Sequence, residues 1–104
     1  MQGVFMSEKK KKEAWLEKTG ELIRERRYSL GKEFKNRDFF VQDRSENLFS
    51  YNEWISTRYL ASIELGNNQI SIEKLIQLAF ALETDPIELF AEIEKIYLQE
   101  KSTE

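Results

Sequence analysis

The segment from residue 55 to residue 75, ISTRYLASIELGNNQISIEKL, contains the same helix-start pattern twice. In each copy an isoleucine precedes a serine, and a leucine follows the serine four positions later. A serine at this place caps a helix because its hydroxyl accepts hydrogen bonds from the free amides of the first turn. The flanking isoleucine and leucine can pack against each other across the cap. The pattern therefore predicts two consecutive helices, which begin at Ser56 and Ser71.

The rest of the chain is also predicted to be helical. One proline and four glycines in 104 residues offer few of the turns that a sheet requires. Apolar spacing predicts a helix over residues 11–30, ended by Gly31. Ser45 is expected to cap a short helix that ends near residue 53, and Asp85 followed by Pro86 to begin the last helix. The expected fold is an all-α bundle of five helices.

The apolar residues of the last two helices are expected to face the core, because they recur at helical spacing. They are Leu75, Ile76, Ala79, Phe80, Leu82, Leu89, Phe90, Ile93 and Ile96.

The length of the chain predicts a single domain, over residues 11–98. Residues 1–10 are expected to form a flexible basic N-terminus and residues 99–104 a frayed C-terminus. No hydrophobic run has the length of a membrane span, and the absence of cysteine is compatible with a reducing compartment. A cytoplasmic protein without membrane association is therefore expected.

The sequence offers little for catalysis. It has no histidine and no cysteine, so the commonest general base and metal ligand and the thiol nucleophile are all absent. The 19 acidic residues are scattered over predicted helix surfaces, and no glycine-rich phosphate-binding loop occurs. We therefore expect no enzyme activity, no cofactor and no metal.

The helices predicted over 45–53 and 56–64, with a tight turn between them, make a helix-turn-helix. In this motif the second helix lies in the DNA major groove. Periodicity directs Leu60 and Ile63 toward the core. The residues directed outward are Thr57, Arg58, Ala61 and Ser62. Arg58 can bind guanine O6 and N7 together, which contributes about 1–3 kcal/mol of base discrimination; the alternative is an ordinary solvated arginine.

Three segments stand in the order and at the spacing of a known family: GELIRERRYSLG (20–31), SENLFSYNEWISTRYLASIELG (45–66) and SIEKLIQLAFALETDPIELF (71–90). They resemble the Cro and phage-repressor type of helix-turn-helix protein, also called XRE-like. The resemblance implies a lambda-repressor-like bundle that binds operator DNA as a dimer on pseudo-palindromic sites. It implies base reading by Thr57, Arg58 and Ser62, with Ala61 against a thymine methyl group.

The resemblance also implies a structural ion pair and a set of phosphate contacts. Glu64, near the end of the recognition helix, is expected to pair with Arg27, and a partly buried pair of this kind costs more to break than it contributes. For Tyr59 the alternative to a phosphate contact is packing against the preceding helix. The candidate phosphate contacts are Ser45, Tyr59, Asn67, Asn68, Lys35, Arg37 and Arg44.

Several features depart from the family pattern. Glu46 stands where the family has a glutamine that contacts DNA, and Trp54 replaces a turn glycine that uses positive φ. An insertion of about twelve residues, 32–43, is expected between the first and second helices. Three interpretations are open. The basic residues of this segment contact DNA phosphates, its aromatic residues pack on the domain or on a sister subunit, or the segment is simply a longer loop. Residues 9–12 form either an arm along the duplex or a solvated chain end.

These patterns favour a sequence-specific regulator of transcription that binds double-stranded DNA, expected to be a dimeric repressor. The alternative is an antitoxin or bridging protein that uses the same fold to bind a protein partner. The net charge of −3 and the uncharged loop at 67–69 favour this alternative. A homodimer is expected through the C-terminal helix, because the apolar residues of this helix would be exposed to solvent unless a second subunit packs on them. The candidate surface residues are Leu89, Phe90, Ile93, Ile96 and Tyr97.

Overall fold

The computed structural model describes residues 12–103, which form helices and no strands. The elements are α2 (Ala14–Tyr28), a 3-10 turn η1 (Lys32–Lys35), α3 (Arg37–Leu48), α4 (Thr57–Glu64), α5 (Ile72–Ala81) and α6 (Pro86–Lys101). The prediction of an all-α bundle with five helices is confirmed for this part of the chain. The expected basic N-terminus at 1–10 lies outside the described residues, and α6 extends into the segment that was expected to fray.

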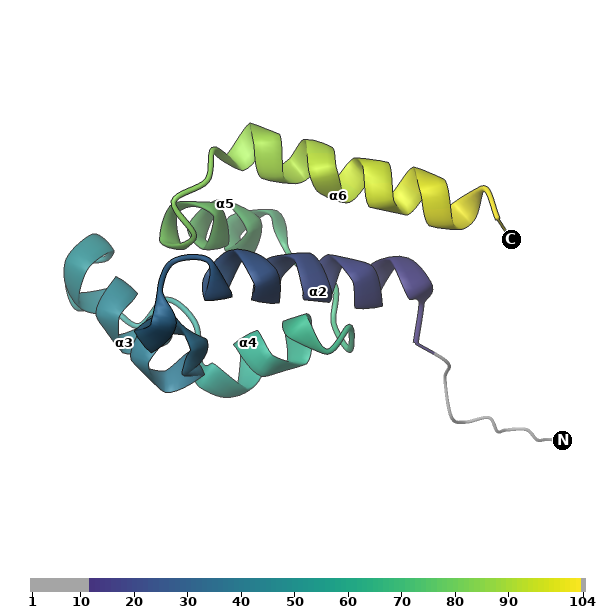
Figure 1. Ribbon diagram of the computed structural model, residues 1–104. Helices are drawn as coiled ribbons and strands as arrows, with labels where there is room; N and C mark the ends of the chain where they lie inside the picture. The colour runs from purple at the N-terminus through teal and green to yellow at the C-terminus, as the bar shows by residue number, and fades with distance from the viewer. Residues whose placement is uncertain (1–11, 104) are drawn as a thin grey trace, which may run out of the picture.

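The central element of the bundle is α2 (Figure 1). α6 lies along one side of α2 and α4 along the other, and both make extensive contacts with it. α3 packs near the end of α2 and contacts η1, α4 and α5, while α5 packs against α6. α4, the predicted recognition helix, is thus held between α2 and α3.

Every helix contributes a fully buried apolar residue to one core. These residues are Ile23, Phe40, Leu60, Leu78 and Leu89. Trp54 and Ile55 join the core from the segment before α4. Because each helix buries its own part of this core, removal of one helix would expose apolar surface on the others.

Three of the predicted helix starts are confirmed. The Ser56 hydroxyl accepts a hydrogen bond from the Tyr59 amide at 3.0 Å, and the Ser71 hydroxyl accepts one from the Lys74 amide at 3.1 Å. The Asp85 carboxylate accepts from two amides of α6, and Pro86 occupies the first turn. These caps satisfy amides that have no partner within their own helix.

The start of α3 differs from the prediction. Asn36 is the N-cap, and its Oδ1 accepts from the Phe39 amide at 2.8 Å. The segment at 32–43 is therefore η1 followed by the first turns of α3 rather than an irregular insertion. Ser45 lies in the last turn of α3, where its hydroxyl donates to the Asn52 carbonyl at 2.8 Å. The helix predicted over 45–53 is wrong because Asn36 caps the same helix earlier.

The extra length of the chain lies instead between α3 and α4, in residues 49–56. Ser50 and Tyr51 take left-handed conformations, with φ of 56° and 66°, and these end α3. Trp54 is not a left-handed residue: its side chain is buried, stacks on Phe49 and donates from Nε1 to the Val41 carbonyl at 3.2 Å. The chain thus reverses without a glycine at position 54, and the predicted tight turn is replaced by a longer connection.

A glycine allows α2 and α4 to approach closely. A Cβ atom on Gly20 would lie 2.3 Å from the Glu64 carbonyl oxygen and 2.6 Å from that of Ile63. Real Cβ atoms essentially never make contacts this short. The crossing of the two helices therefore requires glycine at position 20.

The expected burial of the last two helices is wrong at three positions. Leu78, Ala79, Leu82 and Leu89 are buried, but Ile76, Phe80 and Phe90 are exposed by 41%, 54% and 55%. α5 packs against α6 and α3, and these contacts leave Ile76 and Phe80 exposed. Apolar residues on a further face of a helix need a further partner, which the described residues do not supply.

Candidate nucleic-acid interface

A buried ion pair fixes the position of α4. Arg27 Nε and Nη2 each donate to a Glu64 carboxylate oxygen at 2.7 Å, and the two side chains are 1% and 0% exposed. Arg27 Nη1 also donates to the carbonyls of Phe34 and Lys35 in η1. One guanidinium therefore joins α2, α4 and η1, and it uses the planar geometry that only arginine provides.

Glu64 has a second cationic partner. Arg37 Nε, in the first turn of α3, donates to Glu64 Oε1 at 2.9 Å. The carboxylate at the end of α4 is thus shared between α2 and α3. Three N–H donors from two arginines reach this carboxylate, which supplies the pairing that a buried charge requires.

Arg58 is the most accessible of the predicted base-reading residues. Arg58 stands in the first turn of α4, and its side chain is exposed. Its guanidinium makes no hydrogen bond or ion pair with any of residues 12–103. A free guanidinium at this place retains all its donors for an external acceptor.

The other three predicted base-reading residues are more restricted. Thr57 Oγ1 donates to Asp38 Oδ1 of α3 at 2.7 Å. Ser62 Oγ accepts from Asn68 Nδ2 at 2.6 Å, and Ala61 is half-buried. Asp38 was not singled out from the sequence, although its place in the first turn of a capped helix is favourable for an acidic residue.

The candidate phosphate contacts differ in how accessible they are. Asn67 and Asn68 are exposed in the loop after α4, and Lys35 is exposed with its ammonium 5.4 Å from the centre of the Tyr28 ring. Tyr59 is half-buried, with its hydroxyl 3.5 Å from the Gln69 carbonyl, and Ser45 is held by its bond at the end of α3.

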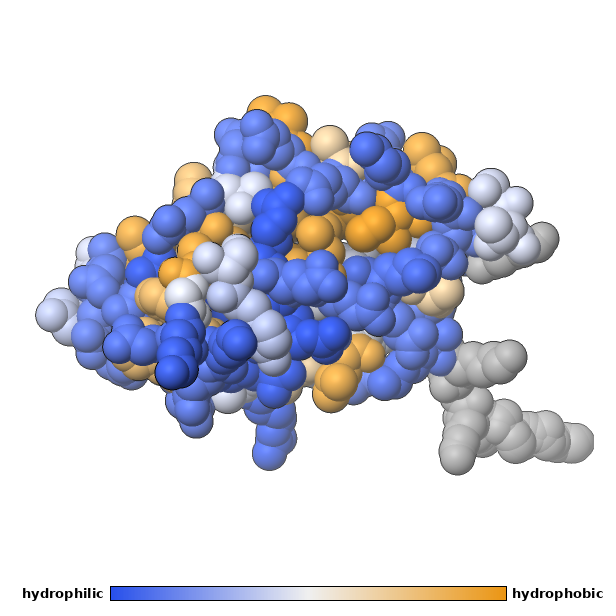
Figure 2. Space-filling view, viewed as in Figure 1, coloured by the Kyte–Doolittle hydropathy of each residue, from blue (hydrophilic) through white to orange (hydrophobic). Residues whose placement is uncertain are grey.

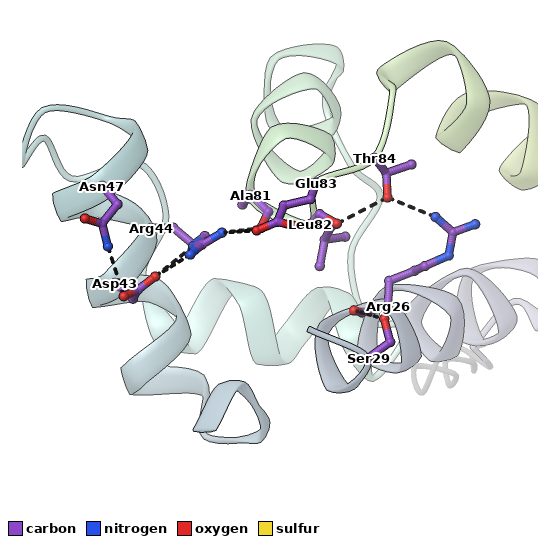
Figure 3. A network of polar contacts seen from close by, with 9 residues as sticks. All are labelled: Arg26, Ser29, Asp43, Arg44, Asn47, Ala81, Leu82, Glu83 and Thr84. Carbon is purple, nitrogen blue, oxygen red and sulfur yellow. Dashed lines mark hydrogen bonds and ion pairs between the residues drawn. The ribbon is translucent and has the colours of Figure 1, made fainter. Parts of the chain in front are cut away.

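Arg44 is wrongly assigned as a phosphate contact. Its side chain is buried and points from α3 toward the end of α5, where Nη1 donates to Glu83 Oε2 at 3.1 Å (Figure 3). Nε donates to Asp43 at 3.0 Å, and the guanidinium lies 4.9 Å from the centre of the Phe34 ring. Arg44 therefore joins α3 to the α5–α6 turn and has no free face for DNA.

The position that follows the cap of α3 also changes. Because Asn36 is the cap, the residue after it is Arg37, and Glu46 lies two turns further on, where it accepts from Gln42 at 2.6 Å. The sequence predicts an acidic residue, Glu46, directly after the cap of this helix. The structure has a basic residue there, Arg37, whose guanidinium pairs with Glu64.

A second surface of interest is hydrophobic. α5 exposes Ile72, Ile76 and Phe80 at intervals of one turn, and α6 exposes Phe90 and Tyr97. Figure 2 shows further hydrophobic side chains between α2 and α6 on a face that is otherwise mostly hydrophilic.

The dimer surface expected on α6 needs one correction. Leu89 is fully buried, so it cannot contact a second subunit, whereas Ile93 and Ile96 are half-buried.

No family model, curated protein or solved structure matches this chain. Within residues 12–103 no helix is long and apolar enough to cross a membrane. In the same part of the chain no group of three or more acidic side chains is arranged to hold a metal ion.

Proposed function

We propose that this protein is a sequence-specific regulator that binds double-stranded DNA as a homodimer and represses transcription by occupying its operator. The observation that carries the proposal is Arg58, an exposed and unpartnered guanidinium in the first turn of a helix whose orientation is fixed. The resemblance of the sequence to the Cro and phage-repressor type adds to it.

The rigidity of α4 supports this role. Base recognition requires a side chain held within a fraction of an ångström of its productive geometry. The C-terminal end of α4 is fixed by the Glu64 carboxylate and by the close approach of Gly20 to the Ile63 and Glu64 carbonyls. Arg58 then projects from a helix that cannot rotate freely.

In this proposal the start of α3 contacts the phosphate backbone of the DNA. Asp38 and Thr57 bring the first turns of α3 and α4 together. The free amides of a helix N-terminus attract phosphate, and Arg37 adds a positive charge there. Asp38 opposes this attraction, which predicts modest affinity and makes Asp38 the residue to test.

The experiment is selection from random duplex DNA at near-physiological salt with the purified full chain. The proposal predicts a two-fold-symmetric motif whose half-sites lie about one helical turn, or a multiple of it, apart. Arg58→Ala should lose preference at one base position of each half-site, by about 1–3 kcal/mol. Lys95→Ala removes an exposed cation from α6 and serves as the control, which should select the wild-type motif.

Two outcomes would contradict the proposal. Folded protein that enriches no sequence would remove the sequence-reading function. An Arg58→Ala motif identical to that of the wild type would remove the role of Arg58 while leaving DNA binding in place.

A second candidate function is the binding of a protein partner, as in antitoxins and bridging factors. The observation that favours it is the hydrophobic surface of Ile72, Ile76 and Phe80, since exposed apolar patches mark interaction sites. Co-expression with the product of a neighbouring gene would test it. A stable complex that is lost in Phe80→Glu but retained in Arg58→Ala would favour this function over DNA binding alone.

A further inference from the structure

The loop that follows α4 carries no positive charge of its own. Its exposed residues are Asn67, Asn68 and Gln69, whose amides can donate to phosphate oxygens but neutralise no charge. Neutralisation of phosphates by lysine and arginine supplies the salt-dependent part of the affinity for DNA. A cation at this loop has to come from another part of the chain.

Lys12 lies at the end of α4, although it precedes that end by 53 positions in the sequence. Its Nζ donates to the carbonyl of Leu65, the C-cap residue of α4, at 3.2 Å. A cation is favoured there because the C-terminal end of a helix is its negative end. Lys12 and residues 66–69 also line one groove. The described chain therefore begins beside the loop that follows α4 (Figure 1).

Close packing holds the chain at this place. Gly66 has a φ of 80°, and a Cβ atom on it would lie 2.8 Å from the Cα atom of Glu17, in the first turn of α2. The start of α2 thus meets the residue that directly precedes Asn67. Because Lys12 is two positions before the start of α2, the same contact keeps its backbone near the loop.

Lys12 has donors left for an external anion. It forms no ion pair with any of residues 12–103, and its single hydrogen bond to a carbonyl leaves two ammonium protons. The other charged residue that lines the groove is Glu13, which accepts from Lys101 at 3.0 Å, so its charge is countered. The Glu17 carboxylate is also close to the loop, so Lys12 alone would leave this end of α4 near neutrality.

The residues that directly precede Lys12 add the missing charge. Residues 8–12, EKKKK, contain four lysines and one glutamate, a net charge of +3. Residues 8–11 lie outside the described part of the chain, but covalent geometry limits how far residues 9–11 can be from Lys12. Three residues span at most about 11 Å. The four lysines are therefore within reach of the loop.

This charge is also close to the predicted base-reading residue. Arg58 and Leu65 are seven positions apart on α4, which corresponds to about 10 Å along a helix. Phosphates follow one another every 3.4 Å or so along a DNA strand, measured on the helix axis, so about 10 Å corresponds to three base pairs. Cations at the end of α4 would contact phosphates of the same half-site.

We propose that Lys12 and the lysines at positions 9–11 bind DNA phosphates beside the loop that follows α4, in the half-site that Arg58 reads. The inference rests on the proposed function and adds phosphate contacts to it. These contacts raise the affinity without adding sequence preference, because the phosphates are alike at every base pair.

The test measures how the binding constant of the full chain depends on salt, with the selected operator and with a scrambled duplex. Each phosphate contact contributes about 0.9 to the slope of log K against log salt. Lys11→Gln combined with Lys12→Gln should therefore reduce the slope by about 1.8 on both duplexes and leave the selected motif unchanged. Glutamine at position 12 can still donate to the Leu65 carbonyl. Lys95→Glu removes two units of charge from α6 and should leave the slope unchanged.

A second set of variants tests where the lysines act. In the background of the double glutamine variant, Asn67→Lys combined with Gln69→Lys returns two cations to the loop itself. This combination should restore the slope of the wild type. Glu88→Gln combined with Glu94→Gln makes the same change in net charge on α6 and should not restore it.

Two results would overturn the inference. The first is an unchanged slope in the double glutamine variant. The second is equal restoration by the charge changes on α6, which would reveal a general effect of net charge. Failure of the proposed function has a different signature, since the wild type would then select no motif. A slope that still falls on the scrambled duplex in that case would retain the phosphate contacts of the lysines.

Discussion

Arg27 and Glu64 join α2 to α4 through two hydrogen bonds of 2.7 Å, and almost no surface of either side chain reaches solvent. Replacement of Arg27 by methionine leaves the Glu64 carboxylate buried with only Arg37 beside it. We expect Arg27→Met to lower the free energy of unfolding by about 3–5 kcal/mol, measured by urea denaturation.

Arg26→Met is the matched control for this prediction. Arg26 pairs with Glu92 at the surface, where side-chain exposures are 29% and 41%. Such pairs contribute about 0–1 kcal/mol, so this variant should be the milder one. Equal losses in the two variants would contradict the structural role of Arg27.

Gly20→Ala is expected to disrupt the packing of α2 on α4. The new methyl group would meet the backbone of Ile63 and Glu64, which cannot move aside as a flexible side chain would. We expect a loss of about 3 kcal/mol or more in the free energy of unfolding, together with loss of DNA binding. Glu21→Ala, on the exposed face of the same helix, should change stability by less than about 0.5 kcal/mol. A stable, DNA-binding Gly20→Ala protein would contradict the close approach.

Asp38→Asn is expected to strengthen DNA binding. The asparagine oxygen can still accept from Thr57, while the negative charge beside the first turn of α4 is removed. The affinity for the selected operator should rise several-fold, and the dependence on salt should become steeper. Glu94→Gln on α6 removes the same charge far from α4 and should have no effect. Unchanged affinity in Asp38→Asn would place DNA elsewhere on the molecule.

Phe90→Glu is expected to weaken the proposed dimer. Phe90 is 55% exposed on α6, the helix expected to carry the dimer surface, and a charge there is incompatible with an apolar interface. Sedimentation equilibrium should show a weaker dimer for this variant. Tyr51→Glu alters another exposed aromatic residue, in the α3–α4 connection, and should leave self-association unchanged. A Phe90→Glu protein that dimerises normally would locate the dimer surface elsewhere.

Thr19→Val is expected to preserve or increase stability. A buried hydroxyl without a partner is destabilising, and valine has nearly the same shape without the polar atom. Thermal unfolding should show a gain of up to about 1 kcal/mol. Thr84→Val should instead lose about 1 kcal/mol, because Thr84 Oγ1 accepts from Arg26 at 3.0 Å. A marked loss in Thr19→Val would indicate that the hydroxyl is already satisfied.

The helix starts at Ser56, Ser71 and Asp85 could be predicted from the sequence because capping depends on a side chain and its own neighbouring amides. The pairing of Arg27 with Glu64 was implied by a family resemblance, and the structure forms that pair. The start of α3 could not be chosen reliably, because Asn36 and Ser45 have equal capping chemistry. In the structure Asn36 is the cap, and Phe40, in the first turns of α3, joins the core.

The remaining differences arise from tertiary packing. The left-handed residues Ser50 and Tyr51 have no sequence signal comparable to glycine, so the long α3–α4 connection was not foreseen. The partners of Arg44 come from the α5–α6 turn, which is distant in the sequence. Apolar periodicity on α5 identified apolar faces but gave no indication of which face a neighbour covers.

The contact at Gly20 determines when this bundle can form during synthesis. Its partners are the carbonyls of Ile63 and Glu64, so α2 leaves the ribosome well before the surface that it packs against has been made. At translation rates of about 5–20 residues per second, the α4 residues that pack against α2 are synthesised on the order of seconds after Ile23. The nascent chain is therefore most exposed to proteases and chaperones before α4 emerges, and the helices become stable together rather than one by one.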